Sequence, residues 1–224
     1  MNPASRKTTS LEDDLEPTWE VAHLFPFQGA WTVEEYLDLP TNHLVEFSNG
    51  RLEVLPMPTT SHQLLVASLY GLLLAFVTAR DLGTVLFAGL PVRIGPRKFR
   101  EPDILFMRKE HAGRIGEKFW KGADLVMEVV SPDPKSRQRD LEKKRLDYAL
   151  AGIPEYWIVD PAEERITVLR LVGKVYRVHG EFPRGMTATS FLLPGFVVDV
   201  TRVLDQKIPG TTRRTRKPKG PAPS

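Results

Sequence analysis

A short apolar run at residues 125–130, LVMEVV, constrains the fold of this chain more than any other feature. A run of this kind is typical of a buried strand. Glu128 interrupts the run, and side chains alternate along a strand, so Val126, Glu128 and Val130 share one face. A carboxylate buried without a partner would take up a proton. Glu128 therefore lies near a strand end, pairs with a core Arg or Lys, or binds a divalent cation.

Local signals predict the elements around this strand. Thr32 and Glu35 have the spacing of a capping box, and Asn49-Gly50 is a strong hairpin signal. Oxygens in residues 59–61 can cap a long apolar helix. We expect helices at 32–39, 61–80 and 139–152, and strands on both sides of Asn49-Gly50, in 84–95 (strand, turn, strand), 103–107, 124–130, 155–160 and 165–180 (a hairpin). Residues 191–200 are expected to close the domain. Helices between strands in one domain predict an α/β fold, with a mixed β-sheet flanked by helices.

The composition is that of one ordinary globular domain. The chain has 224 residues, of which 42% are hydrophobic and 26% charged. It contains no cysteine, so it has no disulfide and no thiolate zinc site. The N-terminal residues lack the apolar segment of a secretion signal, and no apolar stretch approaches the roughly 20 residues that span a bilayer. We expect a cytoplasmic protein without membrane contact.

Charge is distributed unevenly along the chain. The net charge is +3, but residues 205–224 carry six basic residues and one acid, which leaves −2 for the rest. We expect residues 1–17 and the basic tail 205–224 to be disordered, and residues 18–204 to form the folded domain. The tail is either a solubilising end or an arm that attracts nucleic acid.

Several common catalytic motifs are absent from the sequence. It has no GxxxxGK[ST] phosphate loop, no GxGxxG after a strand, no GxSxG and no HExxH. Nucleotide-dependent, serine-hydrolase and zinc-protease chemistry therefore lack their usual support.

Two acids and a lysine form a candidate site. Asp103 starts the strand 103–107 just after Pro102, so two neighbouring strands could each bring one carboxylate to a shared Mg²⁺. The helix after Glu128 supplies a cation. Periodicity places Lys144 with Leu141, Tyr148 and Ala151, and Lys143 with Leu146 and Leu150, so it does not choose between the two lysines.

Together these segments resemble a known superfamily. Glu101-Pro102-Asp103 followed by Glu128 in a strand is similar to the PD-(D/E)XK nuclease signature. The run from Glu128 to Pro161 resembles the Uma family, a widely expanded bacterial group described as restriction endonucleases and long catalogued as a domain of unknown function. The similarity spans about Thr32 to Val200 and includes EFSNGRLEVLPMP followed by His62, Pro102-Asp103, Glu128-Val129-Val130-Ser131, Asp140, Lys144, Tyr148 and GIPEYWIVDP.

The resemblance implies a restriction-endonuclease-like core and a set of site residues. A (D/E)XK triplet that starts at Glu128 would have lysine at position 130, where this chain has Val130. As in the family, the lysine is expected on the following helix, and alignment favours Lys144. The family also uses an early acid as an additional metal or water ligand, and Glu46 corresponds to it. The alternative for Glu46 is a surface charge on an edge strand. His62, at the start of the long helix, either lines the same cleft or makes only local hydrogen bonds at the helix end.

These features predict a Mg²⁺- or Mn²⁺-dependent endonuclease that hydrolyses phosphodiester bonds, with DNA as substrate. Asp103, Glu128 and the carbonyl of Val129 would hold the ion, Lys144 would act on the attacking water, and Glu46 would support the site. Many nucleases of this superfamily act as dimers, so we expect a homodimer. The alternative is a catalytically inactive nuclease fold that binds nucleic acid or protein.

Overall fold

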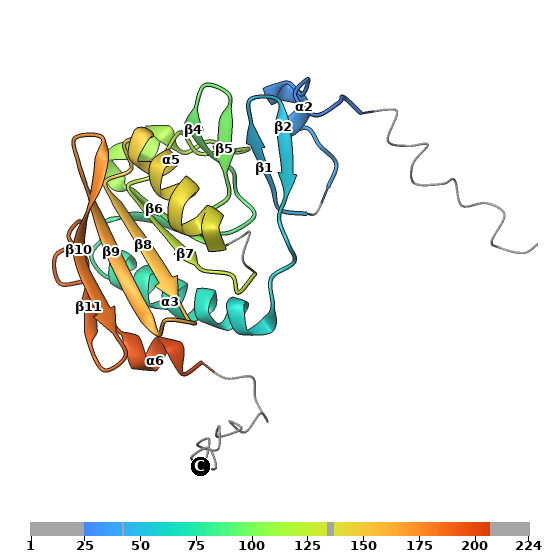
Figure 1. Ribbon diagram of the computed structural model, residues 1–224. Coiled ribbons are helices and arrows are strands. Elements are labelled where there is room, and N and C mark those ends of the chain that lie inside the picture. Colours follow the sequence, from blue (N-terminus) through green and yellow to red (C-terminus); the bar gives the residue numbers. More distant parts are fainter. Residues whose placement is uncertain (1–24, 42, 134–136, 207–224) are drawn as a thin grey trace, which may run out of the picture.

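The computed structural model describes residues 25–41, 43–133 and 137–206 (Figure 1). The expected disorder of residues 1–17 lies outside these ranges, as does nearly all of the basic tail. The chain order is α2 (Val33–Leu37), β1 (Val45–Ser48), β2 (Arg51–Val54), α3 (Thr60–Thr78), β3 (Gly83–Phe87), β4 (Val92–Gly95), β5 (Lys98–Arg100), β6 (Ile104–Arg108), the 3₁₀ helix η1 (Lys109–Arg114), β7 (Leu125–Val129), the π-helical turn η2 (Arg139–Lys143), α5 (Lys144–Leu150), β8 (Glu155–Asp160), β9 (Arg165–Val172), β10 (Val175–Pro183), β11 (Thr187–Thr189), β12 (Val197–Asp199) and α6 (Val200–Leu204).

A six-stranded mixed sheet, in the order β10-β9-β8-β7-β6-β3, forms the centre of the fold. Strands β7 and β8 are parallel, and the other neighbouring pairs are antiparallel. The parallel pair arises because η2 and α5 carry the chain back between them. The predicted α/β fold with a mixed sheet flanked by helices is confirmed.

Helices cover both faces of this sheet, as Figure 1 shows for α3 and α5. One core contains the apolar residues of α3 and α6 together with inward-facing residues of β6 to β9. A second core on the opposite face contains Val126, Val130, Tyr148 and Tyr156. All five residues of β7 are buried, which explains why its sequence is apolar on both sides of Glu128.

A second, antiparallel sheet has the order β2-β1-β5-β4 and surrounds a small aromatic core. The predicted hairpin at Asn49-Gly50 joins β1 to β2, and the predicted capping box of Thr32 and Glu35 opens α2. Both strands predicted in residues 84–95 are present, but they do not pair with each other. β3 pairs with β6 in the large sheet, whereas β4 pairs with β5 in the small one, so the two strands separate to join different sheets.

Helix α3 is strongly apolar along its whole length. Its length and composition would allow it to cross a membrane, contrary to the expectation from the sequence. Core helices of globular proteins pass the same test. In this fold Leu65, Leu69 and Leu73 of α3 are buried against the large sheet, which accounts for their apolar character.

Candidate active site

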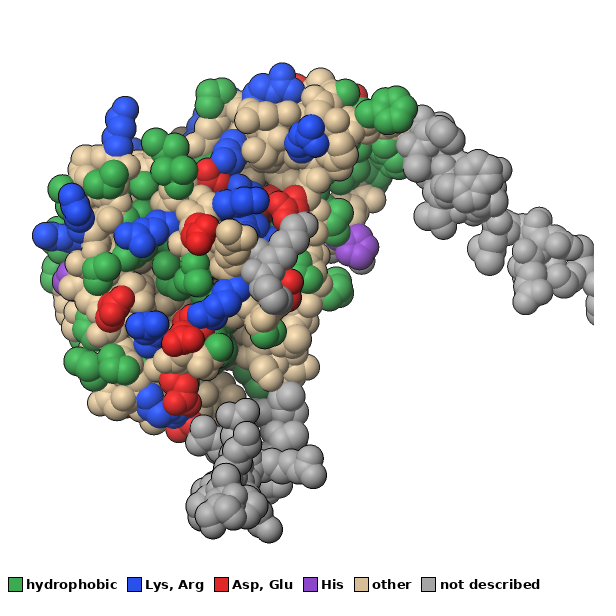
Figure 2. Space-filling view, viewed as in Figure 1, with side chains coloured by type: hydrophobic (Ala, Val, Ile, Leu, Met, Phe, Trp, Pro, Cys, Tyr) green, Lys and Arg blue, Asp and Glu red, His purple; other side chains and the backbone are tan. Residues whose placement is uncertain are grey.

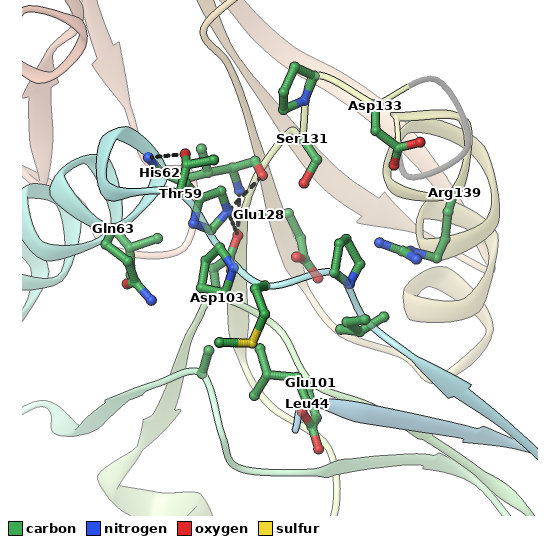
Figure 3. Close-up of a pocket in the computed structure, with 18 of the residues that line it drawn as sticks. Leu44, Thr59, His62, Gln63, Glu101, Asp103, Glu128, Ser131, Asp133 and Arg139 are labelled. Carbon is green, nitrogen blue, oxygen red and sulfur yellow. Dashed lines mark hydrogen bonds and ion pairs between the residues drawn. The ribbon is translucent and has the colours of Figure 1, made fainter. Parts of the chain in front are cut away.

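A cavity of about 320 Å³ lies where the large and small sheets meet (Figure 3). The start of α3, the carboxyl end of β7 and the segment after β2 all contribute to its wall. The polar side chains around it are those of Thr59, His62, Gln63, Glu101, Asp103, Glu128, Ser131, Asp133, Arg139 and Lys144. In Figure 3, His62 and Thr59 lie across the cavity from Asp133 and Arg139.

The two predicted metal-binding acids both line this cavity. Strands β6 and β7 are neighbours, and Ile104 is paired with Met127. Asp103, one residue before Ile104, is therefore level with Glu128 in the antiparallel register. Asp103 Oδ2 also accepts a hydrogen bond of 2.8 Å from the backbone N–H of Val129. The structure thus brings Asp103, Glu128 and the backbone of Val129 together.

Glu128 is only 2% exposed, and two residues of α5 stabilise it there. Lys144 Nζ donates to Glu128 Oε2 at 2.9 Å, and the Tyr148 hydroxyl donates to Oε1 at 2.6 Å. Burial and the charge of Glu128 hold the pKa of Tyr148 well above its usual value, so the hydroxyl remains a donor. Lys144 and Tyr148, one helical turn apart, therefore supply the hydrogen-bond partners that the buried carboxylate of Glu128 requires.

The structure distinguishes the two candidate lysines. The side chain of Lys144 is 3% exposed. The residues on the same side of the helix as Lys144, which are Leu141, Tyr148 and Ala151, all pack in the core on that face of the sheet. Lys143 is exposed, and the residues on its side of the helix, Leu146 and Leu150, are 59% and 63% exposed. Of the two lysines, it is Lys144 whose ammonium reaches the cavity.

Glu46 is not the surface charge that one interpretation of the sequence proposed. Strand β1 lies between β2 and β5, and Glu46 is 1% exposed. Its Oε2 accepts from Arg100, and its Oε1 lies 3.6 Å from Lys144 Nζ. Whether Glu46 is a metal or water ligand remains a prediction, but its position beside Lys144 is compatible with a role in the site.

Arg100 links the small sheet to α5 and was not identified from the sequence. Besides Glu46, it donates to Asp147 Oδ2 through Nη2 at 2.6 Å and through Nε at 3.1 Å. Asp147 also pairs with Lys98. Because Asp147 follows Lys144 by three residues on α5, these ion pairs hold the turn of helix that carries the lysine. The short strand KFR offered no periodic pattern that could have revealed this link.

His62 reaches further than its position at a helix end suggests. Its backbone N–H makes the local bond to the N-cap hydroxyl of Thr59, at 3.2 Å. Its ring, however, contacts β7, since Nε2 lies 3.2 Å from the carbonyl oxygen of Val129 and 3.3 Å from Asp103 Oδ2. Burial lowers the pKa of His62, but the hydrogen bond and charge of Asp103 outweigh it and raise the pKa overall. A purely local role for the side chain is therefore wrong.

The oxygen donors in the cavity fit a hard divalent cation. Mg²⁺ commonly takes one or two protein carboxylates and retains several waters, and Asp103, Glu128 and the Val129 carbonyl offer two carboxylates and one carbonyl. Each carboxylate oxygen has two lone pairs, so a hydrogen bond to it does not preclude a further contact. Within residues 25–41, 43–133 and 137–206, no three His, Asp or Glu side chains converge as a metal cluster. A site here would therefore complete its coordination with water or substrate.

The fold and this cavity define the class of protein, a nuclease-like protein of the restriction-endonuclease-like fold. A similar solved structure is a "putative nuclease belonging to DUF820" from Anabaena variabilis ATCC 29413, with a TM-score of 0.65 and 20% sequence identity. The similarity covers 78% of this chain and 99% of that one. No curated protein matches the chain.

Residues 33–201 match the Uma2 family, described as "Putative restriction endonuclease". This match covers most of the chain, and the chain belongs to that family. The resemblance seen in the sequence is therefore confirmed, and so is the expected restriction-endonuclease-like core.

Proposed function

We propose that this protein is a Mg²⁺- or Mn²⁺-dependent endonuclease that hydrolyses phosphodiester bonds in DNA. The observation that carries the proposal is the 2.9 Å contact between Lys144 and Glu128, in a cavity that Asp103 also lines. Glu128 on β7, Asp103 just before the neighbouring β6, and an ammonium group beside them provide the chemistry that phosphodiester hydrolysis needs. Membership of the Uma2 family supports the same reaction class.

Each residue has a definite task in this proposal. Asp103, Glu128 and the Val129 carbonyl would hold the ion, which when bound polarises the scissile phosphate and lowers the pKa of a water molecule. Lys144 orients the attacking water and stabilises negative charge that develops on the phosphate. Tyr148 donates to Glu128 and keeps that carboxylate oriented. Glu46 balances the charge of Lys144 from the opposite side.

The distribution of charge bears on how a nucleic acid would be attracted. On the face seen in Figure 2, Lys and Arg side chains are interspersed with Asp and Glu. The concentrated positive charge of the sequence is in residues 205–224. Phosphate contacts by Lys and Arg make binding depend on salt, so removal of the tail should weaken DNA binding and flatten its salt dependence.

Cleavage assays with matched variants test the catalytic proposal. Wild-type protein is incubated with supercoiled plasmid, single-stranded DNA and RNA, in Mg²⁺, Mn²⁺ or EDTA. We expect metal-dependent cleavage of DNA that Glu128→Gln and Lys144→Met abolish. Lys143→Met removes the neighbouring, exposed lysine and should cleave like the wild type.

Folding of each variant must be checked by circular dichroism and thermal unfolding. This is essential because loss of one partner of a buried ion pair can destabilise a protein by about 3–5 kcal/mol. Folded Lys144→Met with undiminished cleavage would refute the role of the lysine. Metal-independent DNA binding without cleavage under any condition would favour the inactive scaffold, and preferential cleavage of RNA would correct the substrate.

A further inference from the structure

His62 occupies an informative position between two of the proposed metal ligands. Its Nε2 is within hydrogen-bonding distance of the Val129 carbonyl oxygen, at 3.2 Å, and of Asp103 Oδ2, at 3.3 Å. Both of these atoms are acceptors, so Nε2 carries a proton and donates to them. Figure 3 shows the His62 ring beside Asp103 at the cavity wall.

The hydrogen bonds of His62 close a small ring of contacts around Val129. Asp103 Oδ2 accepts from the backbone N–H of Val129 at 2.8 Å, while His62 bridges the same carboxylate oxygen to the carbonyl oxygen of Val129. The carboxylate is thereby fixed relative to the end of β7. With Oδ2 occupied by two N–H donors, Asp103 Oδ1 is the oxygen left to bind a ligand in the cavity.

The position of the imidazole itself is fixed by the start of α3. The hydroxyl of Thr59 caps the helix by accepting from the backbone N–H of His62, so the residue is held in the first turn. Its side chain is 16% exposed, which limits its freedom to turn into solvent. A rigid donor of this kind is what orients ligating carboxylates in metal sites.

We propose that His62 is a positioning residue, whose Nε2–H holds the Asp103 carboxylate and the Val129 carbonyl so that they can share one divalent cation. The inference rests on the proposed function, because it assumes that these groups bind a metal. His62 does not contact the ion in this arrangement. Its task is to keep two ligands from different strands in one orientation.

Mn²⁺ binding measured by isothermal titration calorimetry tests this role without any cleavage assay. His62→Ala removes the donor and should weaken Mn²⁺ affinity by about 10–100-fold, the usual effect of losing a group that orients a ligand. His62→Gln carries an amide N–H at a similar reach and should restore most of the affinity. His179→Ala removes an exposed histidine that does not line the cavity and should bind Mn²⁺ like the wild type.

Electron spin-echo spectroscopy of bound Mn²⁺ separates positioning from direct ligation, because a coordinated imidazole nitrogen gives its own modulation. We expect no such modulation in the wild type. Its presence, undiminished affinity in His62→Ala, or equal losses in the Ala and Gln variants would overturn the inference. Absence of Mn²⁺ binding in the wild type would instead overturn the proposed metal site itself. Thermal unfolding in EDTA shows whether each variant is folded.

Discussion

Glu101 is a carboxyl group whose affinity for a proton is changed by the fold. It is 7% exposed, and within the described part of the chain its Oε2 has no hydrogen-bond partner. Burial and the nearby charge of Glu46 raise the pKa of Glu101 to about 7, against the opposing effects of a hydrogen bond from Val45 and the charge of Lys144. In the unfolded chain the same group has its ordinary pKa of 4.5.

This difference makes stability depend on pH in a defined direction. The folded protein retains the proton of Glu101 at pH values where the unfolded chain has released it. The contribution of this proton to the free energy of unfolding is therefore fully present below pH 4.5 and is lost as the pH rises towards 7. Each tenfold change in proton affinity corresponds to about 1.4 kcal/mol, so the loss over this interval is about 3 kcal/mol. Glu101→Gln has no proton to release and should avoid the loss.

We therefore expect Glu101→Gln to exceed the wild type in free energy of unfolding by about 3 kcal/mol near pH 8, and to match it near pH 4. Urea unfolding in EDTA at a series of pH values measures this difference. Glu117→Gln, at an exposed position, serves as the control and should show little difference at any pH. A Glu101→Gln difference that is independent of pH, or that grows as the pH falls, would refute the reasoning.

Three further substitutions test the packing of the fold and of the site. Glu155→Ala removes the acceptor of four hydrogen bonds and should lower the free energy of unfolding by about 3 kcal/mol or more in urea, whereas a loss below about 1 kcal/mol would contradict its buried role. Thr59→Ala removes the N-cap of α3 and should cost about 1 kcal/mol in the same assay, with Thr59→Ser close to wild type; equal losses would argue against capping. Tyr148→Phe removes the 2.6 Å donor to Glu128 and should cost about 1.5–3 kcal/mol, and an unchanged urea midpoint would show that the bond contributes nothing.

Much of the fold could be predicted because its signals are local. The turn at Asn49-Gly50 and the capping box at Thr32 each depend on a few adjacent residues, and both are confirmed. Of the three residues 59–61 that could cap the long helix, it is Thr59 that does so. The apolar run at β7 similarly indicated burial on both faces. Such signals reflect backbone conformation and burial, which the sequence encodes within a few residues.

Pairing between distant elements could not be predicted in the same way. Nothing in residues 84–95 indicates that β3 and β4 join different sheets, because their partners β6 and β5 lie further along the chain. The ion pairs of Arg100 with Glu46 and Asp147 join residues 54 and 47 positions apart. The sequence identified the acids of the candidate site, and the family resemblance favoured Lys144. Periodicity alone did not choose between the two lysines, and the packing of α5 places Lys144 in the core and Lys143 at the surface.

The π-helical turn η2 has a consequence for how such a site can vary. It ends at Lys143, so α5, which begins at Lys144, directly follows a turn that is wider than an α-helical one. Because its hydrogen bonds run i→i+5, a π turn holds about one residue more than an α-helical turn, so η2 sets the rotation of α5, with Lys144 and Tyr148, relative to residues 137–138. Because α5 supplies the amine, the segment after Glu128 needs no lysine at position 130, and Val130 packs in the hydrophobic core. Searches that require acid and amine within one triplet would overlook proteins assembled in this manner.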